Sequence, residues 1–89
     1  MSGAPDTFGP DARLRELVMY LAKAIVDEPE AVEVEEVEED GVLVFELTVA
    51  EPDLGKVIGR QGKTARALRT LLSAAGAKLQ TRVSLEILE

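Results

Sequence analysis

The chain has 89 residues, the length of one small domain. It contains neither cysteine nor histidine, which excludes disulfides, thiolate metal sites and the usual general base near neutral pH. No apolar run approaches the ~20 residues of a membrane span, and no signal-peptide pattern follows the first methionine. We therefore expect a cytoplasmic protein without a metal or another cofactor.

The charges are divided unevenly along the chain. Residues 1–53 carry three basic and fifteen acidic side chains, whereas residues 54–82 carry seven basic side chains and no acid. The net charge of −7 alone would argue against a nucleic-acid partner, but the basic segment reverses that argument. The plainer alternative is a solvated acidic surface beside a solvated basic helix. We favour an anion site because the basic residues surround a glycine turn.

The chain begins with a short lead-in and a helix. Residues 1–9 are polar and contain glycine and proline, and we expect them to be disordered. Apolar residues recur at helical spacing from Pro10 to about Val26, and Pro29 then opposes further helix. We assign Tyr20, near the apolar stripe, to half-buried packing rather than to base stacking.

Two strands follow the first helix. Residues 31–35 and 42–49 alternate between apolar and polar side chains. Residues 36–41 between them are acidic and end in an Asp-Gly pair, which is typical of a hairpin turn. These carboxylates could be a metal site, but they lack regular ligand spacing, and a solvated edge and turn explains them better.

The second half predicts two helices and a last strand. A short helix is expected over residues 51–58, and a long basic helix from Lys63 to about Ala75. We expect Gly76 to end the long helix in the left-handed conformation. Residues 81–87 alternate as a strand. The expected core face of the long helix consists of Ala65, Leu68, Leu72 and Ala75.

The order helix, strand, strand, helix, helix, strand predicts an α+β fold. The first two strands pair through the hairpin, and the helical crossover allows the third to lie parallel to the second. We expect a three-stranded mixed sheet with three helices on one face.

The most informative stretch is the turn Gly59-Arg60-Gln61-Gly62, which leads directly into the long helix. Glycine permits positive φ angles and close approach of a ligand to the backbone. The helix that follows directs unpaired N–H groups and a partial positive charge toward the turn. The turn therefore predicts a site for phosphate or another anion. Five basic residues surround it: Lys56, Arg60, Lys63, Arg66 and Arg69.

This motif and the element order resemble the type II KH domains of bacteria. Over residues 13–88, the chain is most similar to the KhpA family of small stand-alone KH proteins, so we expect one KH domain over residues 10–89. The resemblance rests on the Gly55–Gly62 motif, on the Asp27-Glu28-Pro29 ending of the first helix and on the segment after the motif. It implies cytoplasmic binding of single-stranded RNA, and self-association or pairing with a KhpB (Jag/EloR) type protein. It also implies a role in cell elongation and division.

The resemblance places an RNA groove at the motif. Gly59 and Gly62 would let phosphates reach main-chain N–H groups, while Arg60 and Gln61 point outward. Lys63 would contact phosphate, although a lysine that only aids solubility is the alternative. Lys56 and Arg66 would flank the track, and an apolar floor for bases would be formed by Val57, Ile58 and Ala65, with help from Val44 or Leu47.

Two features of the sequence limit this groove. Many KH motifs have isoleucine where this chain has Ala65, and a smaller side chain packs less closely against bases. No aromatic residue lies in residues 46–89, so base–aromatic stacking is not available near the motif. We expect weak, salt-dependent binding with low sequence preference. At least one of the pair Val57 and Ile58 should belong to the core.

A second apolar strip runs along the long helix through Ala67, Leu71 and Ala74. It is either buried core or a dimer contact. We do not expect an enzyme, because the chain has no histidine or cysteine and residues 54–82 contain no carboxylate to hold a metal. The segment Gly62-Lys63-Thr64 ends like a Walker A loop, but that loop would need glycine where the chain has Val57. The remaining alternative is a KH fold that binds only protein.

Overall fold

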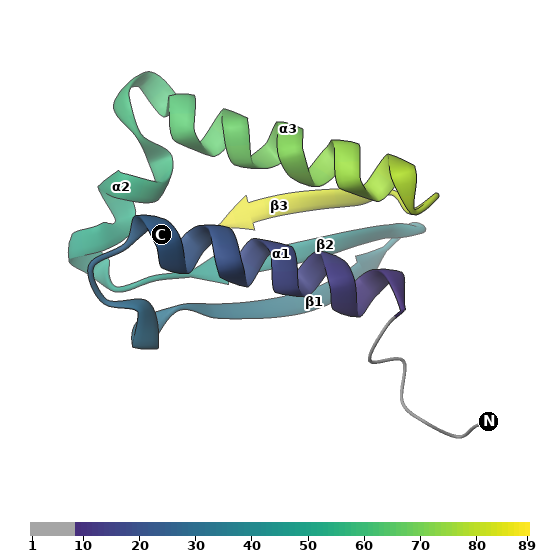
Figure 1. Ribbon diagram of the computed structural model, residues 1–89, viewed down its shortest axis with the longest axis horizontal. Coiled ribbons are helices and arrows are strands. Elements are labelled where there is room, and N and C mark those ends of the chain that lie inside the picture. The colour runs from purple at the N-terminus through teal and green to yellow at the C-terminus, as the bar shows by residue number, and fades with distance from the viewer. Residues whose placement is uncertain (1–8) are drawn as a thin grey trace.

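The computed structural model describes residues 9–89 (Figure 1). Disorder was expected for residues 1–9, and all of these except Gly9 lie outside the described part. The principal elements follow the predicted order, with three short 3₁₀ turns at Pro29–Ala31, Glu51–Asp53 and Arg60–Gly62. The helices and strands are α1 (Pro10–Ile25), β1 (Glu33–Glu39), β2 (Val42–Thr48), α2 (Leu54–Ile58), α3 (Lys63–Lys78) and β3 (Val83–Ile87).

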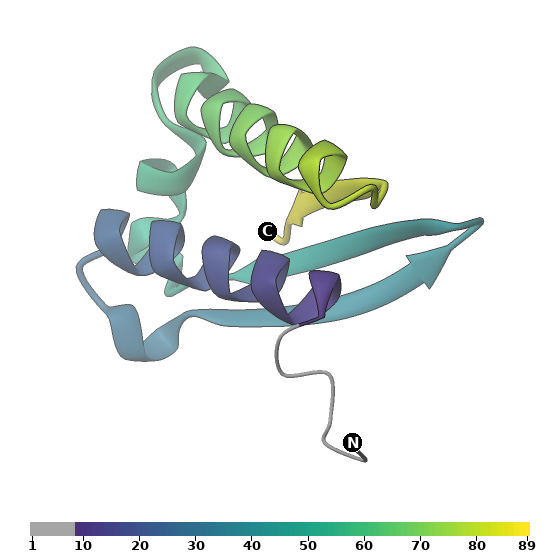
Figure 2. The ribbon, with the colours of Figure 1, turned by 45° about the vertical axis from the view of Figure 1, so that its right-hand side comes forward.

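The three strands form one mixed sheet in the order β1-β2-β3. β1 pairs antiparallel with β2, and β2 pairs parallel with β3. The helices lie on one side of this sheet, with α1 and α3 over its face and α2 at one end (Figures 1 and 2). The predicted α+β architecture is confirmed.

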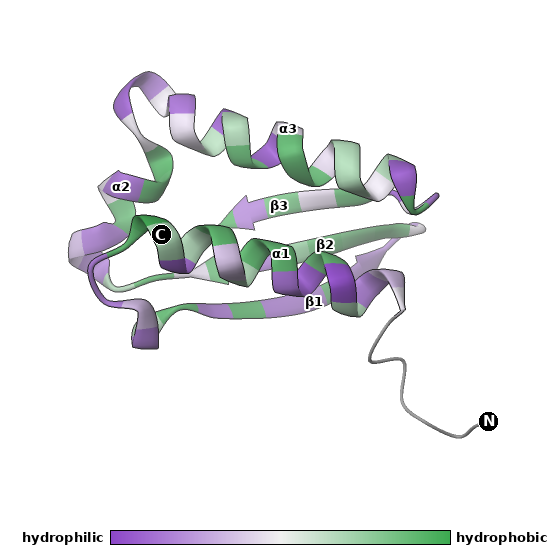
Figure 3. Cartoon of the chain, viewed as in Figure 1, coloured by the Kyte–Doolittle hydropathy of each residue, from purple (hydrophilic) through white to green (hydrophobic). Residues whose placement is uncertain are grey.

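The core lies between the sheet and the two long helices. Phe45 and Leu47 of the central strand are almost fully buried, as are Leu14 of α1 and Leu72 of α3. Removing such side chains from water is the main favourable contribution to folding. Figure 3 shows mostly apolar residues along β2, whereas hydrophilic and apolar residues alternate along the edge strand β1.

α1 starts and stops where its sequence predicts. Pro10 opens the helix, and the buried residues Leu14, Val18 and Ala22 recur every fourth position. Tyr20 lies between these positions on the opposite face and is 71% exposed. The assignment of Tyr20 to half-buried packing was therefore wrong.

The acidic run forms the end of the edge strand β1 and the hairpin turn. β1 continues to Glu39, and only Asp40 and Gly41, both with positive φ angles, form the two-residue hairpin turn. The first strand was predicted to end at residue 35, which is too early, because an edge strand tolerates carboxylates that face solvent. The hairpin tip lies at the opposite end of the molecule from the turn between α2 and α3 (Figure 2).

α3 is longer than predicted, and Gly76 does not end it. The helix continues to Lys78, and the positive φ angle after it belongs to Gln80. A Cβ on Gly76 would lie 2.7 Å from the Thr81 carbonyl oxygen and 2.8 Å from Val83 Cγ2. Glycine is needed here because the chain returning to β3 passes close to the helix, not because the backbone turns.

Candidate nucleic-acid interface

The two glycines of the turn have different conformational requirements. Gly59, with φ 78° and ψ 170°, occupies a region that is accessible essentially only to glycine. A Cβ there would lie 2.6 Å from Thr64 Cβ and 2.8 Å from the Thr64 backbone nitrogen. Gly62 is left-handed, with φ 74° and ψ 14°, and the nearest atom to its Cβ position is Arg66 Nη1 at 3.8 Å. The first glycine is therefore obligatory, whereas the second position has room for a side chain.

The turn delivers the chain to the N-terminus of α3. Gly62 N–H donates to the Gly59 carbonyl at 3.1 Å, which closes the turn, and Gln61 between them also has a positive φ angle. Among residues 9–89, no side chain caps α3 at this end. The first N–H groups of a helix have no intrahelical carbonyl partners, and the helix dipole adds partial positive charge. This end of α3 can therefore accept an anion.

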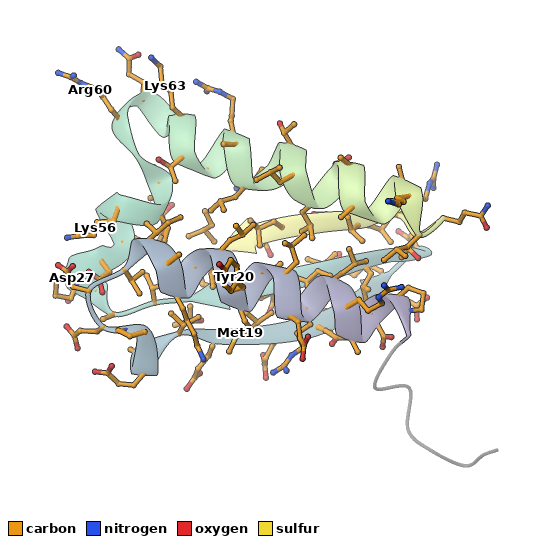
Figure 4. All side chains as sticks on the ribbon, viewed as in Figure 1. Met19, Tyr20, Asp27, Lys56, Arg60 and Lys63 are labelled. Carbon is orange, nitrogen blue, oxygen red and sulfur yellow. The ribbon has the colours of Figure 1, made fainter. Side chains whose placement is uncertain are left out.

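Three cations surround this helix end. Arg60, Lys63 and Arg66 are exposed and form no ion pair with any of residues 9–89. Figure 4 shows Arg60 and Lys63 extending away from the body of the protein. Since the acidic hairpin lies at the far end, it does not neutralise them. Arg69 is different: its Nε donates to the Leu85 carbonyl at 3.2 Å, which joins α3 to the edge of β3.

Lys56 is paired within the protein. Its Nζ lies 3.3 Å from Asp27 Oδ2 and 3.7 Å from Asp53 Oδ1 (Figure 4 labels Lys56 and Asp27). The hydrogen bond and the charge of Asp27 raise the pKa of the Lys56 ammonium group, and Asp53 adds to this effect. Lys56 thus differs from the three unpaired cations.

The predicted apolar floor is mostly core. Val57 is fully buried and Ala65 is 5% exposed, whereas Ile58 is half-buried and borders the turn. The expectation that at least one of the pair Val57 and Ile58 belongs to the core is confirmed. Leu47 is also core, at 1% exposure. Of the three motif residues, Ile58 presents the most apolar side-chain surface.

Asp53 was not predicted to have a structural role beyond the start of the short helix. Its side chain is 1% exposed and is the one buried charged group among residues 9–89. Asp53 Oδ2 accepts a hydrogen bond from the Glu28 N–H at 3.0 Å. An acidic residue at the start of a helix is typical of helix capping or of interaction with the helix dipole. No local sequence pattern indicates that its partner lies 25 positions earlier in the chain.

The apolar strip on α3 is at the surface. Ala67, Leu71 and Ala74 are all exposed, and Leu71 is 51% exposed. The alternative that this strip is buried core is wrong for the single chain.

Neither a metal site nor a membrane span is found in the described part of the chain. Residues 9–89 contain no group of three acidic side chains placed to hold a metal ion. None of the helices described there is long and apolar enough to cross a membrane.

A G-x-x-G turn joining two helices, within an α-β-β-α-α-β fold around a mixed sheet, defines a type II KH domain. The chain belongs to the KhpA/KhpB KH-domain family, whose profile matches residues 15–87. Membership of this family also confirms that the chain is not an enzyme.

The similar proteins agree with this assignment. The chain is 45% identical over 76 residues to the RNA-binding protein KhpA of Chlamydia pneumoniae, which covers 85% of this chain and 97% of that protein. It is 51% identical over 76 residues to RNA-binding protein KhpA of Aquifex aeolicus, with 85% and 96% covered. RNA-binding protein KhpA of Caldanaerobacter subterraneus is 52% identical over 73 residues, with 82% and 97% covered.

Solved structures show the same fold within a larger protein. Era of Aquifex aeolicus, bound to GDP and AlF4⁻, matches with a TM-score of 0.62 and 22% identity over 84% of this chain and 29% of Era. Era in complex with MgGDPNP and nucleotides 1506–1542 of 16S ribosomal RNA matches with a TM-score of 0.59 and 23% identity, over 83% and 28%. At this identity the likeness concerns the fold alone.

Proposed function

We propose that this protein binds single-stranded RNA at the turn between α2 and α3. The proposal rests mainly on the N-terminus of α3, which follows a glycine turn. Within the described residues, this helix end has no side-chain cap and the three cations around it have no acidic partner. The relatives named RNA-binding protein KhpA support the same assignment. The alternative, a KH fold that contacts only protein, leaves those unpaired cations without a role.

In the proposed complex, a phosphate lies against the backbone of Gly59 and Gly62 and the first N–H groups of α3. Neighbouring phosphates are neutralised by Arg60, Lys63 and Arg66, and Gln61 reaches toward the RNA. Bases lie over Ile58, while Val57 and Ala65 support this surface from beneath. Without an aromatic platform, affinity is low, depends strongly on salt and varies little with base sequence.

A salt titration tests this proposal. The variant Arg60→Gln/Lys63→Gln/Arg66→Gln should bind a short labelled single-stranded RNA about tenfold more weakly, and its slope of log affinity against log salt should fall by about 2. Fluorescence anisotropy over a range of salt concentrations measures both values.

The control removes three charges elsewhere. Arg13→Gln/Lys23→Gln/Lys78→Gln has the same net charge, and its substituted positions are also exposed. It should keep most of the parent's affinity and slope. Equal losses in the two variants would mean that overall charge, rather than the turn, attracts RNA. A parent protein that binds no RNA at low salt would favour the protein-contact alternative.

We also propose that the exposed strip Ala67, Leu71 and Ala74 is a contact with a second copy or with a KhpB-type KH protein. Exposed apolar side chains in one row suit such a contact, and a second copy would raise the avidity of a weak RNA site. By extension from the family, we propose that the protein acts in the cytoplasm, in regulation of cell elongation and division.

Leu71→Glu tests the self-association. It should shift the mass in solution from dimer to monomer, because dimerisation would bury the unpaired Glu carboxylate in an apolar contact, which is unfavourable. Sedimentation velocity measures this shift. Leu88→Glu is the matched control, since Leu88 is 42% exposed but lies at the C-terminal end of the chain. A dimeric Leu71→Glu variant, or an equal effect of Leu88→Glu, would contradict this interface.

A further inference from the structure

Three charged side chains connect the end of α1 to the start of α2. Lys56 Nζ lies between Asp27 and Asp53, at 3.3 Å and 3.7 Å from their nearest oxygens. On its other oxygen, Asp53 accepts the Glu28 N–H at 3.0 Å. Asp27 and Glu28 follow α1, whereas Asp53 and Lys56 belong to α2 and the turn before it. Two segments distant in sequence are therefore joined at one point.

Asp53 is the centre of this connection. Its side chain is 1% exposed, and each carboxylate oxygen has a partner: the Glu28 N–H on one side and the Lys56 ammonium group on the other. A buried carboxylate that loses its partners becomes strongly unfavourable. The arrangement therefore favours one position of α2 relative to the end of α1.

The position of α2 has consequences for the proposed RNA site. The helix has five residues, and at its end the Gly59 N–H donates a hydrogen bond to the Gly55 carbonyl at 2.8 Å. A helix this short has little stability of its own, so tertiary contacts fix its orientation. Gly59 follows directly, and the direction of α2 therefore sets where the turn presents its backbone N–H groups.

We propose that Asp53 is a positioning residue for the RNA-binding turn. Asp53, Lys56 and Asp27 form a latch that fixes α2 against the end of α1, and Lys56 belongs to this latch instead of contacting phosphate. The inference rests on the proposed RNA binding. It makes a prediction of opposite sign to simple electrostatics. An acidic side chain near a phosphate site repels RNA. If charge were the only effect, removing Asp53 would therefore tighten RNA binding. Removal of a latch residue weakens binding.

The test compares Asp53→Asn and Asp53→Ala with Glu51→Gln. Asp53→Ala should bind single-stranded RNA about tenfold more weakly, as expected for loss of one hydrogen bond to a charged group. Asp53→Asn keeps an oxygen that can accept the Glu28 N–H, so its loss should be smaller. Glu51→Gln removes an exposed acid two positions away and should bind as well as the parent or better. The salt slope should be unchanged in all three.

Lys56→Gln separates the two roles of the lysine. If Lys56 acts only in the latch, the variant has the salt slope of the parent. If Lys56 contacts a phosphate, the substitution lowers the slope by about 0.7. A lowered slope would therefore return Lys56 to the RNA track and overturn that part of the inference.

Amide hydrogen exchange provides a readout that does not depend on RNA. Asp53→Asn should accelerate exchange of the Gly59 amide, while the buried amides of α3 keep parent rates; Glu51→Gln should change neither. Unchanged exchange at Gly59, or RNA binding by folded Asp53 variants at least as tight as the parent's, would overturn the latch. If Asp53→Ala does not fold, Asp53→Asn decides. If the parent binds no RNA, the proposed function fails, and exchange alone decides whether the latch holds α2.

Discussion

Gly62→Asp should weaken RNA binding by about 100-fold or more, because juxtaposed like charges cost several kcal/mol. The substituted carboxylate would lie at the N-cap of α3, where we place the phosphate. From there it can accept the first helix N–H groups itself and pair with Arg66, whose Nη1 lies 3.8 Å from the Cβ position. The variant would thus occupy the site with its own anion.

The same substitution should leave the fold intact or slightly more stable. The left-handed conformation of Gly62 is tolerated by Asp and Asn better than by other residues. An acid at a helix N-terminus interacts favourably with the dipole. Higher thermal stability together with lost RNA binding is therefore the expected combination.

Gly62→Asn is the matched control for this experiment. Its side chain has the same shape and similar tolerance of the left-handed conformation, but no charge. It should keep RNA binding within about fivefold of the parent, since it adds no like-charge repulsion. Anisotropy titrations and thermal unfolding of both variants give the comparison. Retained binding in Gly62→Asp, or equal losses in both variants, would contradict a phosphate at this turn.

The elements that the sequence predicts well depend on local rules. The stripe of α1 and the turn at Asp40-Gly41 follow from the helical period and from the tolerance of positive φ angles. The G-x-x-G turn is similarly evident, because two glycines three positions apart before a basic helix are typical of a tight turn that approaches an anion. The sheet topology follows from these elements, since a hairpin and a helical crossover leave few possible arrangements.

The errors arose where distant segments meet. Gly76 was assigned to a helix end, but its close neighbours are Thr81 and Val83 on the chain returning to β3. The first strand was predicted to end at residue 35, but pairing with β2 extends it through residues 36–39. Composition cannot reveal either effect, because both depend on which backbone lies opposite.

The same limit applies to the site. Lys56 was placed on the RNA track because it lies close before Gly59 in the sequence, yet its partner Asp27 comes from the end of α1. Asp53 was missed for the same reason. Charge in the sequence identifies where cations gather, whereas only the fold shows which of them are already paired.

Gly59→Ala should destabilise the protein by about 3 kcal/mol, the sum of a backbone conformation that only glycine adopts readily and an overpacked contact. With φ 78° and ψ 170°, Gly59 lies outside the left-handed well that Asn and Asp visit. The added Cβ would also lie 2.6 Å from Thr64 Cβ and 2.8 Å from the Thr64 nitrogen in the first turn of α3. Relief of this overlap requires α3 or α2 to move.

Thermal and urea unfolding measure this loss, which corresponds to a fall in Tm of about 15 °C for a domain of this size. Gly55→Ala is the control. Gly55 lies inside α2 without a positive φ angle, and its Cβ position has no atom within 4 Å. Because alanine there has less freedom to lose on folding, this variant should be more stable than the parent by about 0.5–1 kcal/mol. Parent-like stability of Gly59→Ala would show that the turn has another accessible conformation, and the described geometry would then not be the one that presents α3 to RNA.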